Sequence, residues 1–289
     1  MDGNMEMCKK KAALVCCSNG LAKEEKDVIG RLQERLLAWN LESVESDYLY
    51  AREACFSGTG AERAESVMNF FNDPEIKVIF DVSGGDIANE ILPFLNYSVL
   101  AASEAVFCGY SDLTTVMNAI YAVTGKPSIW YQAKNLVGKQ AENQCGIFGT
   151  KEWFDLSYRF LQGSRMKGIL VGGNIRCLLK LAGTPYWPDM KGKLLFLEAR
   201  SGSQAQMTAY LNQLKQMGVF EQIEGILLGT FLQLEKEAGT SPEAFLSMAE
   251  LTKRCVGEHL PIVQTKDVGH RSDSKALWIG KEYSFSEMT

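Results

Sequence analysis

The feature that most constrains the fold is the regular alternation of short apolar runs with amphipathic stretches in the first half of the chain. The apolar runs occupy residues 12–17, 76–82, 105–109 and 128–131. Segments whose apolar residues recur at helical spacing separate them. Strands that alternate with helices predict a parallel sheet with helices on both faces. We therefore expect an α/β fold in which residues 1–135 form a doubly wound parallel sheet domain.

The alternation resumes in the second half after an interruption. Residues 136–167 contain several glycines among few apolar residues, which predicts a linker. Residues 168–289 are expected to form a smaller C-terminal α/β domain. Because ligands bind beyond the carboxyl ends of parallel strands, an active site is expected in the cleft between the domains. The strands predicted here are 168–171, 194–198, 225–228 and 262–264, and the helices predicted in the whole chain are 23–39, 61–71, 87–95, 113–123, 175–181, 204–217 and 242–256.

Composition and charge exclude several classes of protein. Of the 289 residues, 46% are hydrophobic and 22% are charged, as in ordinary globular proteins rather than in disordered or coiled-coil chains. A net charge of −5 gives no basic surface of the kind that nucleic-acid binding requires. No apolar run approaches the roughly 18 residues of a membrane span. Neither nucleic acid nor a membrane is therefore an expected partner.

The cysteines and histidines restrict the chemistry further. Eight cysteines are scattered without a C-x-x-C pair, which predicts reduced thiols and argues against a structural zinc site. The apolar run at residues 12–17 is shorter than the core of a signal peptide, about 7–15 residues, so a cytoplasmic protein is expected. Only two histidines are present, His259 and His270. A site of three imidazoles is thereby excluded, and an imidazole base has two candidates.

Residues 105–114 (AVFCGYSDLT) are the most informative segment. An apolar strand runs into Gly109, and a helix is predicted directly after Ser111. Such a corner projects a serine hydroxyl beyond the sheet, as in a nucleophile elbow, and the helix start at Asp112 presents free N–H groups to developing negative charge. The G-x-S-x-G pattern is incomplete, since Leu113 stands at the second glycine. The local pattern alone favours a helix cap formed by Ser111 or Asp112 over a nucleophile.

Two further loops carry residues suited to acyl chemistry. Gly84 and Gly85 follow a predicted strand, and paired glycines let backbone amides approach an oxyanion closely, although an ordinary turn has the same composition. His270 lies in a polar loop after the last predicted strand, whereas His259 is expected at a helix end, where it can bond the last carbonyls. Glu198 closes an apolar strand and is expected either to face the crevice or to be a surface carboxylate.

Together these segments resemble the LD-carboxypeptidase family of serine peptidases, which includes muramoyltetrapeptide carboxypeptidases and microcin immunity-type enzymes. The order of the serine, the acid and the histidine is also that of α/β-hydrolase triads. The resemblance extends over residues 76–280. It is carried by residues 83–85 with 91–97, 109–114, 172–174 with 183–186, and 195–198 with 269–270.

The resemblance implies a triad in which Ser111 is the nucleophile, His270 the general base and Glu198 the group that orients the base. It implies no metal and no organic cofactor. The implied oxyanion hole consists of Gly84, Gly85 and Asp112, and the expected substrate contacts are Asn174 and Arg271.

Family members cut an amide near a free carboxylate, either the L,D-bond before a terminal D-alanine in cell-wall peptides or an acyl–nucleotide linkage. The implied partner is therefore a small peptide or a peptidyl-nucleotide, and a homodimer is expected. Ser83 stands where many members carry arginine, and Asn96 replaces a usual aspartate. These departures bear on substrate choice, and Arg271 is expected to supply a carboxylate ligand in place of the missing cation.

Other interpretations remain at this point. Hydrolysis of a nucleotide conjugate would use an aromatic residue over the base, with Trp153 and Trp187 as candidates that are otherwise core residues. A non-catalytic binding protein on the same fold is a further alternative. An amidotransferase would use Cys108 or Cys145, but Cys108 lies within an apolar strand, where burial disfavours a thiolate.

Overall fold

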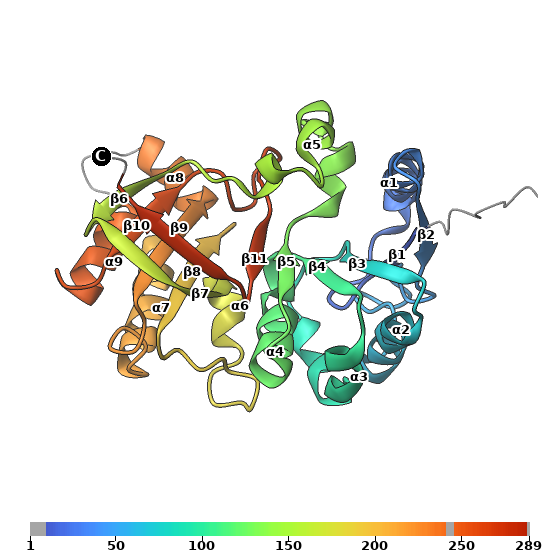
Figure 1. The fold of residues 1–289 in the computed structure, drawn as a ribbon, viewed down its shortest axis with the longest axis horizontal. Coiled ribbons are helices and arrows are strands. Elements are labelled where there is room, and N and C mark those ends of the chain that lie inside the picture. Colours follow the sequence, from blue (N-terminus) through green and yellow to red (C-terminus); the bar gives the residue numbers. More distant parts are fainter. Residues whose placement is uncertain (1–9, 241–245, 288–289) are drawn as a thin grey trace, which may run out of the picture.

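Two six-stranded, mostly parallel sheets lie side by side in the computed structural model, which describes residues 10–240 and 246–287 (Figure 1). These sheets confirm the predicted α/β class with its two domains. In spatial order, the first sheet consists of β11 (Leu277–Ile279), β5 (Ser128–Trp130), β4 (Val106–Gly109), β3 (Ile76–Asp81), β1 (Lys10–Val15) and β2 (Leu41–Glu45). The second consists of β12 (Glu282–Ser286), β7 (Arg165–Asn174), β8 (Lys193–Ala199), β9 (Gly225–Phe231), β10 (Ile262–Thr265) and β6 (Tyr158–Gln162).

The strand directions follow from the order of the chain. In the first sheet, β1 to β5 are parallel, and β11 is antiparallel to β5. In the second sheet, β7 to β10 are parallel, while β12 and β6 are antiparallel strands at its two edges. The carboxyl ends of the parallel strands therefore gather at one edge of each sheet, where ligand sites are expected.

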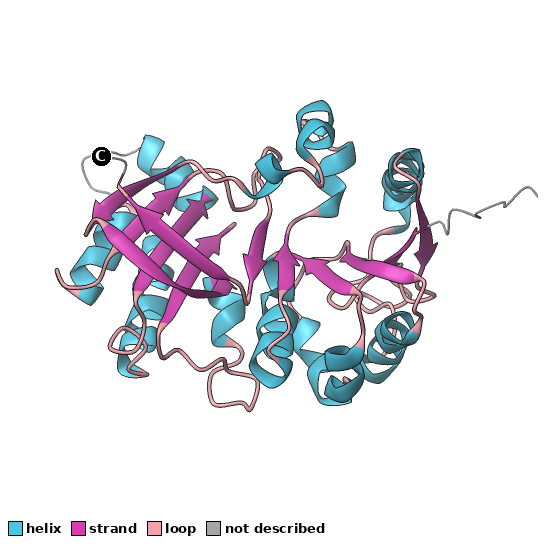
Figure 2. Ribbon diagram, viewed as in Figure 1, coloured by secondary structure: helices cyan, strands magenta, loops and turns pink. Residues whose placement is uncertain are grey.

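Helices lie on both sides of the first sheet, whereas the helices that follow residue 174 pack in one apolar cluster against one face of the second sheet (Figure 2). Three α-helices, α2, α7 and α9, begin with a capping box, in which a serine or threonine and the glutamate or glutamine three residues later bond each other's backbone N–H groups. The α-helices in the described residues are α1 (Lys26–Ala38), α2 (Gly60–Asn72), α3 (Tyr97–Ala102), α4 (Thr114–Thr124), α5 (Ala141–Ile147), α6 (Ile175–Leu179), α7 (Gln204–Gln216), α8 (Leu232–Thr240) and α9 (Met248–Val256). The 3-10 helices are η1 (Lys23–Glu25), η2 (Ala88–Phe94), η3 (Ser111–Leu113), η4 (Ala133–Val137) and η5 (Lys151–Phe154).

Several boundaries differ from the expectation. The helix predicted at 87–95 is the 3-10 helix η2, which contains Pro93. The helix predicted at 242–256 is α9, and residues 242–245 of that prediction lie outside the described residues. The segment predicted as a linker contains α5 and β6, and β11 from the predicted C-terminal domain completes the first sheet. A linker at residues 136–167 therefore does not separate the two sheets cleanly, because residues on its C-terminal side contribute a strand to the first sheet.

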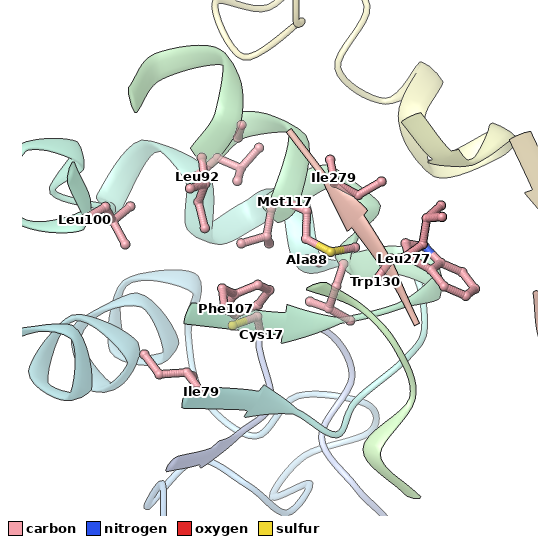
Figure 3. Packing of buried hydrophobic residues seen from close by; sticks show 14 of the residues in the cluster. Cys17, Ile79, Ala88, Leu92, Leu100, Phe107, Met117, Trp130, Leu277 and Ile279 are labelled. Atoms are coloured by element: carbon pink, nitrogen blue, oxygen red, sulfur yellow. The ribbon is translucent and has the colours of Figure 1, made fainter. Parts of the chain in front are cut away.

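One buried apolar cluster extends through both halves. It includes Phe107 and Trp130 of the first sheet together with Phe196 of the second, and the rings of Trp130 and Phe196 meet edge to face at 5.5 Å. Figure 3 shows Trp130 beside Leu277 of β11, its partner in the strand register. A continuous core of this kind fixes the two sheets against each other. No helix within the described ranges is both long enough and apolar enough to cross a bilayer.

Candidate active site

Ser111 lies at the sharp corner between β4 and α4. Its φ is +54°, a left-handed conformation that is costly for a residue with a side chain and that clusters at functional sites. Gly109 makes the corner possible, because a Cβ there would lie 2.8 Å from the Cβ of Leu113. Ser111 is half-buried and begins η3, which leads directly into α4. The serine thus has the backbone strain and the strand–turn–helix setting of a nucleophile elbow.

The carboxylate of Asp112 ties the serine corner to its surroundings. It is fully buried and accepts hydrogen bonds on Oδ2 from Ser18 Oγ at 2.7 Å and from the Ala88 backbone N–H at 2.8 Å. Its Oδ1 accepts from Lys180 Nζ at 2.5 Å. Lys180 follows α6 in the second half, so this ion pair joins the two halves behind the serine. The start of η3 leaves the Asp112 backbone N–H without an acceptor inside the helix.

The turn at Gly84 and Gly85 lies close to the serine corner. A Cβ on Gly84 would lie 3.5 Å from the hydroxyl of Tyr110, the neighbour of Ser111. Gly85 has a φ of +134°, and a Cβ there would lie 2.1 Å from Asn19 Oδ1, which accepts the Asp86 N–H at 3.1 Å. The turn therefore requires glycine. The turn thus lies against the side chain of Tyr110, the residue that precedes Ser111 and Asp112 in the chain.

Ser83, which precedes this turn, belongs to a buried polar framework beneath it. Its hydroxyl donates to Asp81 Oδ1 at 2.5 Å and accepts the Ser18 N–H at 3.1 Å. Burial raises the pKa of Asp81, whereas hydrogen bonds from Cys17 and Ser83 lower it. Ser83 is fully buried. The residue that departs from the family pattern therefore supports the turn from below.

Glu198 and His270 form a close pair. Glu198 ends the apolar run of β8 and its side chain is completely buried, while the side chain of His270 is 4% exposed. Glu198 Oε2 lies 2.6 Å from His270 Nδ1, and Glu198 Oε1 accepts a hydrogen bond from Asn174 Nδ2 at 2.9 Å. Contact with the carboxylate favours the tautomer with a proton on Nδ1 and leaves Nε2 as a proton acceptor.

His270 Nε2 faces no protein partner. Among the described residues it is a buried nitrogen without a hydrogen bond. The ring lies 5.2 Å from that of Tyr110, directly beside Ser111, and 6.4 Å from that of Trp130. No hydrogen bond joins Ser111 to His270 within the described part of the chain. Hydrogen bonds between a nucleophile and its base are often long without substrate and tighten when substrate binds.

Helix α4 carries the connection between the halves beyond the serine. The Asn174 backbone N–H donates to Thr114 Oγ1 at 2.9 Å. Asn118 exchanges two hydrogen bonds with the backbone of Gly172, each 2.8 Å long. The end of β7 is thus fixed to the helix that follows Ser111. Asn174 itself is 5% exposed and its amide is engaged by Glu198 and by the start of α6, so the predicted substrate contact lies behind Glu198.

A cavity of about 320 Å³ opens at His270, within the size range of small-ligand sites. Arg271 lines it, but its guanidinium is paired with Asp273 at 3.0 and 3.2 Å. Burial raises the pKa of Tyr110 to about 12, and the guanidinium of Arg200 opposes that rise. The lining consists of Tyr110, Gln132, Asn135, Arg200, Leu232, Gly269, His270, Arg271 and Ser272.

Five of these lining residues were missed by the sequence analysis: Gln132, Asn135, Arg200, Leu232 and Ser272. Arg200 and Leu232 directly follow β8 and β9, and Gln132 comes two residues after β5. The rule that ligands bind beyond the carboxyl ends of parallel strands would have found these three. Asn135 belongs to the short helix η4 and has no comparable signal in the sequence.

The other candidates from the sequence lie apart from this cavity. Cys108 is fully buried, and burial raises the pKa of its thiol, so the amidotransferase interpretation loses its nucleophile. Cys145 is half-buried, and its Sγ lies 3.5 Å from the Leu136 carbonyl oxygen. Trp153 is enclosed by aromatic rings and Trp187 packs against core clusters. In the described chain neither tryptophan lines the cavity.

Two further residues have purely local surroundings. Asn96 caps α3, since its Oδ1 accepts from the backbone N–H groups of Ser98 and Val99. His259 was expected at a helix end, but α9 ends at Val256 and His259 is exposed in the turn that follows. It lies outside the cavity that His270 lines.

Comparison with known proteins identifies the family of this chain. Models of the LD-carboxypeptidase N-terminal and C-terminal domains match residues 12–131 and 167–285. This chain belongs to the LD-carboxypeptidase family. It is a serine peptidase of that family, so the interpretation as a non-catalytic binding protein is not supported.

Relatives within the family carry two kinds of name. The murein tetrapeptide carboxypeptidase of Pseudomonas aeruginosa is 25% identical over 81% of this chain and 80% of that protein. The microcin C7 self-immunity protein MccF of Escherichia coli is 26% identical over 78% of this chain and 75% of that protein. The structure of MccF in complex with glutamyl sulfamoyl guanosine has the same fold, with a TM-score of 0.81 and 22% identity over 97% of each chain.

Proposed function

We propose that this LD-carboxypeptidase hydrolyses the L,D-amide bond before the terminal D-alanine of murein tetrapeptides through an acyl-enzyme on Ser111. The observation that carries the proposal is the Glu198–His270 pair, which leaves a buried Nε2 without a partner. A catalytic base needs this arrangement, with one ring nitrogen held by a carboxylate and the other available. The similarity to the murein tetrapeptide carboxypeptidase of Pseudomonas aeruginosa supports the substrate class.

Acylation begins when Ser111 Oγ attacks the carbonyl carbon of the scissile amide. As the C–O bond forms, the proton of the hydroxyl passes to His270 Nε2, and Glu198 stabilises the resulting imidazolium. Negative charge develops on the carbonyl oxygen, where the N–H groups of Asp112 and of the turn at Gly84 and Gly85 would receive it.

Collapse of the tetrahedral intermediate completes the first half of the reaction. The C–N bond breaks, and His270 Nε2 returns its proton to the leaving amine, which departs as D-alanine. A water molecule then attacks the ester on Ser111 with His270 as base, and the shortened peptide is released. Asn174 acts as a positioning residue, because its amide holds the Glu198 oxygen that does not contact His270.

The test is release of D-alanine from a muramoyl tetrapeptide by the full-length protein. We expect turnover by the wild-type chain and none by Ser111→Ala. A tetrapeptide that ends in L-alanine is the matched control, and it should be cleaved poorly if the L,D-bond is recognised. Turnover that persists in Ser111→Ala would contradict the serine mechanism. Absence of turnover by the wild-type protein would contradict the murein assignment.

A second candidate substrate is an aminoacyl- or peptidyl-nucleotide. It is favoured by the similarity to MccF, a structure of which holds glutamyl sulfamoyl guanosine. The same triad chemistry applies, with a different leaving group. Hydrolysis of glutamyl sulfamoyl adenosine by the wild-type protein, with no D-alanine released from tetrapeptide, would select this candidate over the first.

The proposal includes a homodimer, as the family resemblance implies, and a cytoplasmic location, as the scattered cysteines predict. Light scattering coupled to gel filtration would then give twice the chain mass of 32.1 kDa. A mass equal to that of one chain would contradict the dimer without affecting the assignment of the triad.

A further inference from the structure

Arg200 places an unpaired positive charge at the cavity beside His270. It follows β8 directly and lies two residues after Glu198. The side chain is exposed and lines the cavity. Among the described residues its guanidinium has neither a hydrogen bond nor an ion pair. An arginine that is free inside a ligand-sized cavity can bind a carboxylate through two parallel N–H groups.

The backbone around Arg200 is fixed, although its side chain is free. The carbonyl of Arg200 accepts the Gln233 N–H at 3.2 Å, and the Gly202 N–H donates to Gln233 Oε1 at 2.8 Å. Gln233 belongs to α8, which continues directly from β9. The loop after Glu198 is thereby held at two points. A charged group on a fixed backbone loses less entropy when it orders on a ligand.

The composition of the cavity favours an anion. Arg200 and Arg271 are the two charged residues that line it, and no aspartate or glutamate in the described chain does so. Arg271 is already neutralised by Asp273 at 3.0 Å. The remaining polar lining consists of the neutral side chains of Tyr110, Gln132, Asn135 and Ser272. Arg200 is thus the cation that has no counter-ion in this cavity.

We propose that Arg200, and not Arg271, binds the free carboxylate of the substrate next to the scissile amide. This inference rests on the proposed function and specifies which residue selects carboxylate-terminated substrates. Arg200 then orients the terminal residue of the substrate so that its amide carbonyl lies between Ser111 and His270. The ligand class is a peptide or acyl compound with a carboxylate near the cleaved bond.

The test compares two tetrapeptides that differ only at the C-terminus, one with a free carboxylate and one with a carboxamide. We expect the wild-type protein to prefer the carboxylate by about 10- to 100-fold in kcat/KM, as a charge-assisted pair provides. In Arg200→Met, kcat/KM should fall for the peptide with the free carboxylate but not for the carboxamide peptide, so the preference is lost. Arg200→Lys should retain part of the preference. Arg271→Met should keep the preference, and Arg254→Met, on the exposed face of α9, is the matched control. Equal losses on both peptides in Arg200→Met, or loss of the preference in Arg271→Met, would overturn the inference.

A binding measurement separates failure of this inference from failure of the proposed function. In the Ser111→Ala background, calorimetry measures the affinity of both peptides with and without Arg200→Met. If the wild-type protein cleaves neither peptide but the carboxylate form binds about 10-fold or more tightly through Arg200, the hydrolytic assignment fails and the inference stands. If the carboxylate form gains no affinity from Arg200, or does not bind, the inference is overturned. Thermal melts of all variants establish that they are folded.

Discussion

The two sides of the cleft hold their reactive groups by different means. On the first-sheet side, Ser111 is positioned by its backbone, with a left-handed φ of +54° at a corner that needs Gly109. On the second-sheet side, His270 is positioned by a charged partner, since Glu198 lies 2.6 Å from its Nδ1. A strained backbone conformation therefore positions the serine, whereas a buried carboxylate positions the histidine. Substitutions on the two sides should fail in different ways.

The largest effect is expected on the side that uses charge. His270→Ala should lower kcat/KM by about 10⁴- to 10⁶-fold, as loss of a triad member does. The matched control is His259→Ala, because His259 is exposed in the turn after α9. That variant should keep its turnover, measured as D-alanine release. If kcat/KM fell by a similar factor in both histidine variants, His270 would not be the catalytic base.

The next effect concerns the charge beneath the base. Glu198→Gln keeps the shape of the side chain but removes the carboxylate that selects the tautomer of His270. We expect kcat to fall by roughly 10³- to 10⁴-fold, with a circular dichroism spectrum like that of the wild-type protein. The control is Glu258→Gln, an exposed acid next to His259. A loss below tenfold in Glu198→Gln would show that the charge is not required.

A smaller effect, on stability, is expected on the side that uses strain. Ser111→Gly should have a free energy of unfolding about 1 kcal/mol higher than Ser111→Ala, because glycine adopts the left-handed conformation without the cost of a Cβ. Both variants lack the hydroxyl and should be inactive. Ala54→Gly is a control outside the site, since Ala54 has a φ of +48°. A lower free energy of unfolding for Ser111→Gly than for Ser111→Ala, measured with urea, would show that the backbone at residue 111 is not strained.

The smallest effect belongs to the ion pairs that join the two sides. The carboxylate of Asp86 contacts the side chains of Arg176 and Lys180. Burial raises the pKa of Asp86, but the two cations have the larger combined effect, so its pKa lies below the ordinary value. This stability is present above the unfolded pKa, about 3.9, and is lost as the pH falls through the folded pKa. The side chain of Asp86 is 60% exposed, so Asp86→Asn should cost less than about 1 kcal/mol at pH 7.

Urea midpoints measured at two pH values check the ion-pair prediction. At pH 7 the wild-type protein should unfold at a slightly higher urea concentration than Asp86→Asn. The difference between the two midpoints should shrink as the pH is lowered toward 2, because protonation removes the charge of Asp86. A difference of the same size at both pH values would mean that the contribution of Asp86 is not ionic.

The interior strands could be predicted from the sequence, whereas the edge strands could not. The strands predicted from apolar runs correspond to β1, β3, β4, β5 and β7 to β10, which have neighbours on both sides in the described sheets. A strand buried on both faces needs a continuous apolar run, as residues 12–15 show. The missed strands β2, β6, β11 and β12 are the edges of these sheets. Three of them have half-exposed sequences without such a run, such as LESVE in β2, whereas β11 (LWI) is apolar but only three residues long.

The apolar strands also reveal two of the reacting residues of the site. Ser111 and Glu198 stand at the ends of apolar strands, so their positions could be inferred from the sequence. The engagement of Arg271 by Asp273 and the lack of a partner for Arg200 among the described residues could not be inferred, because both arginines lie in loops that follow strands and the sequence does not distinguish them. Which of them has a counter-ion depends on local loop geometry. That geometry is visible only in three dimensions.

The return of β11 to the first sheet has a consequence for biosynthesis. Residues 277–279 pair with β5, which precedes them by well over a hundred positions in the chain. The ribosome must therefore release the chain as far as residue 279 before this edge of the sheet is covered, and pairings so distant along the chain form slowly. His270 arrives within the same late segment. A nascent chain consequently carries the serine corner long before it has a base to activate it, so we expect hydrolytic activity to appear only after residues 270–279 have left the ribosome and folded.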